Sequence, residues 1–78
     1  MKKIDVLNLL SGLRDLDAAS ISRRLDGTPE AAGMMLVRLM RYGLVQRELD
    51  DGLFVYNLTS KGEARRSYLN ARDRELTG

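Results

Sequence analysis

Residues 28–45 show the pattern of an amphipathic helix that leads directly into a strand. Thr28 is suited to accept a backbone hydrogen bond as the N-cap, and Pro29 fits the first helical position, where no N–H is needed. Gly43 suits the left-handed residue that closes a helix. Winding the helix at about 100° per residue gives one apolar side, which predicts a core stripe of Ala32, Met35, Leu36 and Leu39, with Met40 at its margin.

The opposite side of this helix mixes apolar and charged residues. Its members are Glu30, Met34, Val37, Arg38 and Arg41. A helix that packs on a core through its other side presents this face to the outside. We expect any function of the helix to lie on this outward face.

The preceding residues predict two shorter helices. Residues 3–11 place apolar side chains on two sides, which indicates packing against two elements at once. Asp17 is suited to cap a second helix over residues 18–25. Asp26 and Gly27 then form the turn into Thr28. Two helices joined by a short turn that contains glycine are typical of a helix-turn-helix.

Residues 45–58 predict a β-hairpin, because Asp51-Gly52 is a strong signal for a two-residue type I′ turn. Pairing Asp50 with Leu53 sets the register and brings Arg47 opposite Tyr56, where the guanidinium can lie over the ring. One face is predicted to be buried, formed by Val45, Leu49, Phe54, Tyr56 and Leu58. The other face is predicted to be solvated, formed by Gln46, Glu48, Val55 and Asn57.

A last helix is predicted over residues 61–75, with Ser60 and Glu63 as a capping box. The order helix, helix-turn-helix, hairpin, helix predicts a mostly helical α+β chain with the architecture of a winged helix. This comprises a three-helix helix-turn-helix core, a β-hairpin wing and a C-terminal helix. We expect residues 1–78 to form a single domain.

Three segments give the sequence a specific resemblance. They are the segment Ala19 to Leu25, which begins with small residues, the junction Leu39-Met40-Arg41-Tyr42-Gly43-Leu44-Val45-Gln46-Arg47, and the segment Tyr56-Asn57-Leu58-Thr59-Ser60-Lys61-Gly62. Over residues 16–66 the chain resembles the winged helix-turn-helix superfamily, in particular MarR-type and related small archaeal and bacterial regulators. The resemblance implies that the outward residues of helix 28–42 enter the DNA major groove. It also implies a basic wing, whereas the predicted wing tip here is Asp50-Asp51.

The amino-acid composition excludes several kinds of catalytic and metal-binding site. The chain has 78 residues, a formal net charge of +2, no cysteine and no histidine. Disulfides, thiol nucleophiles, zinc-finger spacing and the usual neutral-pH general base are therefore absent. With no nucleophile–base pair and no glycine-rich phosphate loop, we expect neither an enzyme nor a metal or cofactor site. No apolar run approaches the roughly 20 residues needed to cross a bilayer, so we expect a cytoplasmic protein without a membrane partner.

The leading hypothesis is a small transcriptional regulator that binds double-stranded DNA, because arginine offers a rigid fork of donors for phosphates or guanine. The expected contact residues are Arg23, Arg24, Thr28, Met34, Val37, Arg38, Arg41 and Arg47. The alternative is a winged-helix module that binds a protein and no DNA, which Glu30, Met34, Val37 and the acidic turn favour. The exposed apolar pair Met34 and Val37 suits thymine methyl groups, a protein partner or a second subunit, and these options stay open.

A homodimer is also expected, because so small a domain has too few elements to cover every apolar side chain of its first and last helices. The predicted dimer interface consists of Val6, Leu9, Tyr68 and Leu69.

Overall fold

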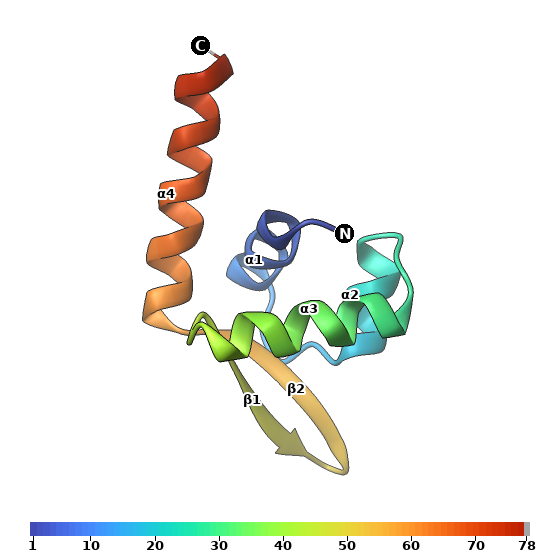
Figure 1. Cartoon of the computed structure of the whole chain (residues 1–78). Helices are drawn as coiled ribbons and strands as arrows, with labels where there is room; N and C mark the ends of the chain where they lie inside the picture. The colour runs from blue at the N-terminus through green and yellow to red at the C-terminus, as the bar shows by residue number, and fades with distance from the viewer. Residues whose placement is uncertain (78) are drawn as a thin grey trace.

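The computed structural model describes the backbone of residues 1–77 and the side chains of residues 1–72. The elements follow in the order α1 (Lys3–Gly12), α2 (Ala18–Arg24), α3 (Pro29–Arg41), β1 (Val45–Asp50), β2 (Leu53–Leu58) and α4 (Ser60–Thr77). The first three helices pack together, the hairpin extends from one side of them, and α4 projects from the other (Figure 1). The predicted winged helix is therefore confirmed. Within the described residues, no helix is long and apolar enough to cross a membrane.

Helix α1 contacts both β2 and α4, which confirms that it packs against two elements. Its residues Val6, Leu7 and Leu10 are buried in the chain's own core. Val6 is fully covered, so its assignment to a dimer interface is wrong. The prediction failed because it did not anticipate that α3 and the base of the hairpin cover this side of α1.

Helices α2 and α3 begin at the predicted caps. The Asp17 carboxylate accepts a hydrogen bond from the Ser20 N–H at 2.9 Å, and the Thr28 hydroxyl oxygen accepts one from the Ala31 N–H at 3.1 Å. Ser22 is buried, as close approach of a neighbouring helix to a small residue requires. These caps set where each helix starts and hence which residues each helix presents.

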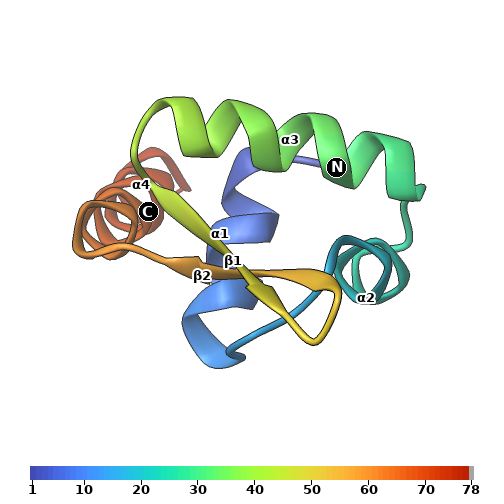
Figure 2. The same cartoon turned by 90° about the horizontal axis from the view of Figure 1, so that it is seen from below.

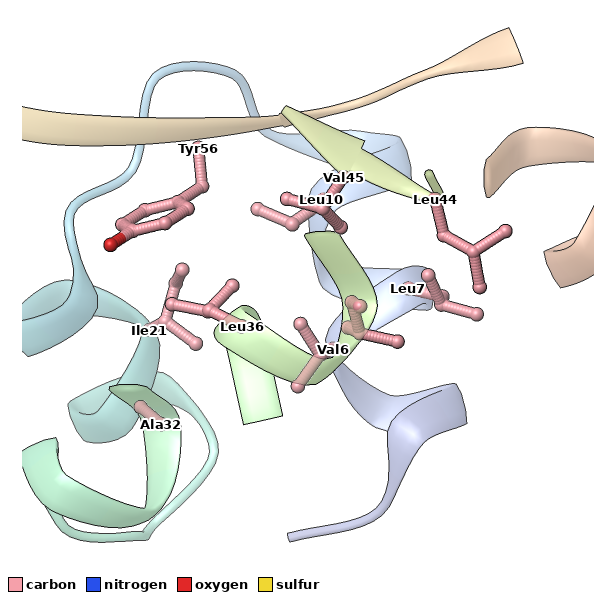
Figure 3. Close-up of a cluster of buried hydrophobic side chains, with 10 residues drawn as sticks. Val6, Leu7, Leu10, Ile21, Ala32, Leu36, Leu44, Val45 and Tyr56 are labelled. Atoms are coloured by element: carbon pink, nitrogen blue, oxygen red, sulfur yellow. The ribbon is translucent and has the colours of Figure 1, made fainter. Parts of the chain in front are cut away.

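The predicted helical phase of α3 is confirmed, because Ala32, Leu36 and Leu39 are fully buried. Leu36 lies beside Ile21 of α2 and the ring of Tyr56 of β2 in the centre of the core (Figure 3). Beyond the C-cap residue Tyr42, the helix is closed by Gly43, whose φ of 73° lies in the left-handed region.

The hairpin has the predicted register, with Asp50 opposite Leu53 and Val45 opposite Leu58. Asp51 and Gly52 both have positive φ, as a type I′ turn requires. The predicted division into a buried and a solvated face is confirmed for Val45 and Tyr56, which are buried, and for Gln46 and Glu48, which are exposed. It is wrong for the outer part of the predicted buried face. Leu49 and Phe54 are 67% and 46% exposed.

Burial instead follows the length of the hairpin, because its outer half extends beyond the helices (Figure 1). At the base, β2 is covered on both faces, whereas Gln46 and Arg47 of β1 are exposed. Val55 and Asn57 are buried on the face that was predicted to be solvated, where the segment between α1 and α2 pairs with β2 through an isolated bridge of Leu16 to Tyr56. Asn57 donates to the Asp15 carboxylate at 2.8 Å and accepts from the Asp15 N–H at 2.9 Å. Because the amide group of Asn57 both donates and accepts a hydrogen bond, its burial is not unfavourable.

The start of α4 differs from the prediction, since Thr59 and not Ser60 is the capping residue. The Thr59 hydroxyl accepts from the Gly62 N–H at 3.0 Å and donates to the Gly43 carbonyl at 2.6 Å. Glu63 is not part of a capping box. Its carboxylate accepts from the Ser11 hydroxyl at 3.1 Å and forms an ion pair with Arg66. Both partners compete for the oxygen atoms that a capping box would need.

Candidate nucleic-acid interface

The outward face of α3 consists of Glu30, Met34, Val37, Arg38 and Arg41, and all five side chains are exposed. At 3.6 residues per turn they fall within an arc of about 100°, with Met34 near its middle. Met34 is 70% exposed and Val37 is 43% exposed. In Figure 2, α3 lies along one edge of the molecule and no other element covers its outer side. The face is therefore open to a large partner.

A shallow depression of about 510 Å³ follows this face. Tyr56 of β2 contributes to it from the base of the hairpin, and Gly33 contributes to it from α3. A Cβ atom added to Gly33 would meet no other atom within 4 Å, so the surface is open at this point. The depression joins the helix to the wing in one continuous surface.

Arg38 and Arg41 lie in the last turns of α3, where a cation is also favoured by the helix dipole. Within residues 1–72, neither side chain is in an ion pair. Both guanidinium groups are thus free to meet an anion. This places two cations at one end of the outward face and the single carboxylate of Glu30 at the other.

Helix α2 supplies the cations Arg23 and Arg24 at its end, and both are exposed. The Arg23 guanidinium donates to the Ser20 hydroxyl at 3.1 Å, which restrains the side chain along α2. Thr28 lies at the start of α3 with its hydroxyl oxygen used as the cap. Its hydroxyl hydrogen remains available to an acceptor.

The wing combines one stacked cation with an acidic tip. The Arg47 guanidinium lies 4.0 Å from the centre of the Phe54 ring, so the prediction that it covers Tyr56 is wrong. Arg47 is paired with Tyr56 across the strands, and the diagonal neighbour Phe54 is within reach of a long side chain. Asp50 and Asp51 are exposed at the tip.

A second, basic depression of about 690 Å³ lies on the other side of Arg38. It is lined by the cations Lys2, Lys3, Arg38, Lys61 and Arg65, together with Met35, Tyr42 and Leu44. This cluster was not predicted from the sequence, because its cations come from three elements far apart in the chain. The only available signal was the excess of basic residues near the starts of α1 and α4.

The carboxylates with altered acidity lie away from the α3 face. Hydrogen bonds from Ser20 lower the pKa of Asp17, and the hydrogen bond from Arg66 lowers the pKa of Glu63. A lowered pKa favours the charged carboxylate, so neither group is suited to donate a proton near neutral pH. Their arrangement supports structural roles.

The sequence matches no family model and none of the curated proteins. The fold, however, is similar to solved structures of bacterial proteins. The PcaV transcriptional regulator from Streptomyces coelicolor has a TM-score of 0.90 and 26% identity, over 96% of this chain and 57% of that one. A MarR family protein from Bacillus stearothermophilus has a TM-score of 0.82 and 25% identity, over 95% of this chain and 54% of that one.

MepR from S. aureus, solved as a DNA complex, has a TM-score of 0.82 and 20% identity, over 99% of this chain and 67% of that one. The resemblance to MarR-type winged-helix regulators is thus confirmed at the level of the fold. The chain spans little more than half the length of PcaV and of the B. stearothermophilus protein.

Proposed function

We propose that this winged-helix chain binds double-stranded DNA as part of a transcriptional regulator, with the outward face of α3 in the major groove. The observation that supports this most is the uncovered side of α3, which presents Met34, Arg38 and Arg41 on a helix with both ends fixed. B-DNA's major groove admits one α-helix. The similarity to PcaV, a transcriptional regulator, and to MepR, solved with DNA, supports the same function. Such a function places the protein in the cytoplasm.

The cations divide into two groups around the helix. Arg38 and Arg41 grip phosphates at the end of α3, while Arg23 and Arg24 approach the backbone from α2 with Thr28 between them. Phosphate contacts of this kind fix the position of the helix, and base contacts then provide specificity. Met34 and Val37 occupy the part of the face nearest the bases.

The wing contributes Arg47, which its stacking on Phe54 holds partway along the hairpin. Asp50 and Asp51 repel phosphates, so the tip itself stays away from the backbone. This wing therefore differs from the basic wing that the resemblance implies.

We further propose a homodimer built on α4 and the exposed edge of α1. Tyr68 is 53% exposed, and Leu9 of α1 and Leu69 of α4 are half-buried side chains at the edge of the core, on two helices that contact each other. The projecting part of α4 has no packing partner on its outer side in Figure 1. A two-fold symmetric dimer would present two α3 helices to successive half-sites.

The second candidate function is a protein-binding module that does not bind DNA. It is favoured by the exposed apolar pair Met34 and Val37 and by the acidic, apolar wing with Leu49 and Leu53 exposed. Under this function the same face binds a protein surface, and Arg38 and Arg41 are peripheral to it.

Titration of labelled duplex DNA at several salt concentrations distinguishes the DNA-binding function from the protein-binding function. Arg41→Ala is expected to weaken binding and to reduce the slope of log K against log salt by about one unit, because one phosphate contact is lost. Arg14→Ala removes the same charge from the exposed segment between α1 and α2 and is expected to leave the slope unchanged. Absence of saturable, salt-sensitive binding would contradict the proposed function, and equal slopes in both variants would contradict the assigned surface.

A further inference from the structure

Apart from the Glu30 carboxylate, the first two thirds of α3 offer only apolar groups on the outward face. Its exposed outward residues are Glu30, Ala31, Met34 and Val37. Residues 30–37 contain no asparagine, glutamine, serine, threonine, lysine or arginine. Recognition helices contact base edges chiefly through their N-terminal part, so this is the segment that decides sequence preference.

The chemistry of the major groove restricts what such a surface can recognise. Adenine is read best by asparagine or glutamine, and guanine by arginine or lysine, because each needs hydrogen bonds at its base edge. Thymine alone presents a methyl group to the groove, and apolar side chains complement it. An apolar surface pressed against the other bases would leave their polar edges without partners, which is unfavourable.

The local geometry suits a methyl group. Met34 lies near the middle of the face, and its unbranched side chain adapts to the shape that it contacts. Gly33 beside it lines the depression and leaves open space above the helix. Val37 follows Met34 by one turn on the same side. Gly33 lies one turn before Val37 and flanks it, so Met34, Val37 and the open backbone at Gly33 form a continuous contact surface.

We infer that Met34 and Val37 recognise the C5 methyl groups of thymines, so that the preferred duplex has thymines at the positions facing them. This inference rests on the proposed DNA-binding function and specifies its sequence class. Arg38 and Arg41 provide affinity through phosphates, whereas Met34 and Val37 provide the preference for thymine.

The test compares two duplexes that differ only in methyl groups. The tightest-binding duplex is selected from a random-sequence pool, and a second copy is made with every thymine replaced by deoxyuridine. This replacement keeps the charge and the hydrogen-bonding edge of each base. The wild type is expected to bind the deoxyuridine duplex roughly fourfold more weakly for each contacted methyl group lost.

The double variant Met34→Ala/Val37→Ala is expected to bind both duplexes with the same affinity, because the groups that meet the methyls are gone. Both residues are exposed, so the variant should keep the melting temperature of the wild type. Arg41→Ala serves as the matched control: it should bind both duplexes more weakly and keep the thymine-to-deoxyuridine ratio.

Equal affinity of the wild type for the two duplexes would overturn the inference and leave the DNA-binding function standing. A ratio that persists in Met34→Ala/Val37→Ala would also overturn it, since the methyl preference would then arise elsewhere. A lack of saturable binding to any duplex in the pool would overturn both the function and the inference.

Discussion

Thr59 and Gly62 hold the end of α3 against the start of α4, Thr59 through hydrogen bonds and Gly62 through a close backbone contact. The Thr59 hydroxyl bonds to both the Gly43 carbonyl and the Gly62 N–H, and the Thr59 N–H donates to the Leu44 carbonyl at 3.1 Å. A Cβ added to Gly62 would lie only 2.0 Å from the Leu44 carbonyl oxygen. The two sequence segments that suggested a winged helix therefore meet in space, and glycine is required where their backbones touch.

Gly62→Ala is expected to destabilise the fold by about 1–3 kcal/mol, because the added methyl group forces the backbone of Leu44 to shift. Gly33→Ala is the matched control, since its Cβ would enter open space. In that helix interior alanine should stabilise by about 1 kcal/mol. Thermal denaturation of the two variants checks the contrast, and equal melting temperatures would mean that the junction is looser than described.

At the scale of elements, local signals determined most of the fold. The caps Asp17 and Thr28, the closing Gly43 and the Asp51-Gly52 turn act over a few residues, and the structure confirms each. The core stripe of α3 could also be predicted, because helical periodicity alone determines it.

The predictions that failed depend on contacts between distant segments. Asn57 is buried because it pairs with Asp15, and no pattern within the hairpin indicates this partner. Leu49 and Phe54 are exposed because the outer half of the hairpin extends beyond the helices (Figure 1). The alternation of apolar and polar residues along a strand does not indicate how far the strand extends beyond its neighbours. The outward face of α3 could be predicted because all its residues belong to one helix. The basic depression that Lys2, Lys61 and Arg65 help to line could not be predicted, because its residues come from distant segments.

At the scale of the whole molecule, α4 gives the chain its elongated shape. The longest dimension is 44 Å, compared with 25 and 21 Å for the other two. Among the described side chains of α4, Tyr68 is exposed and can be covered by a second copy, which is the basis of the proposed dimer.

Sedimentation velocity tests this dimer. The wild type is expected to sediment as a dimer at micromolar concentration, and Tyr68→Glu as a monomer with a similar melting temperature, because the introduced charge lies in the exposed interface. Tyr42→Glu, at an equally exposed tyrosine beyond the end of α3, should leave the dimer intact. A wild-type monomer at high micromolar concentration would rule the dimer out.

The proposed function requires that the outward face of α3 contact DNA. Two-dimensional amide NMR of the isotope-labelled protein, recorded during titration with a duplex, locates the contact surface. The largest shift changes are expected at Ala31, Met34, Val37 and Arg41, with little change at Ala71 and Arg72 on the exposed side of α4. Changes centred on α4, or none at saturating duplex, would contradict the proposed function.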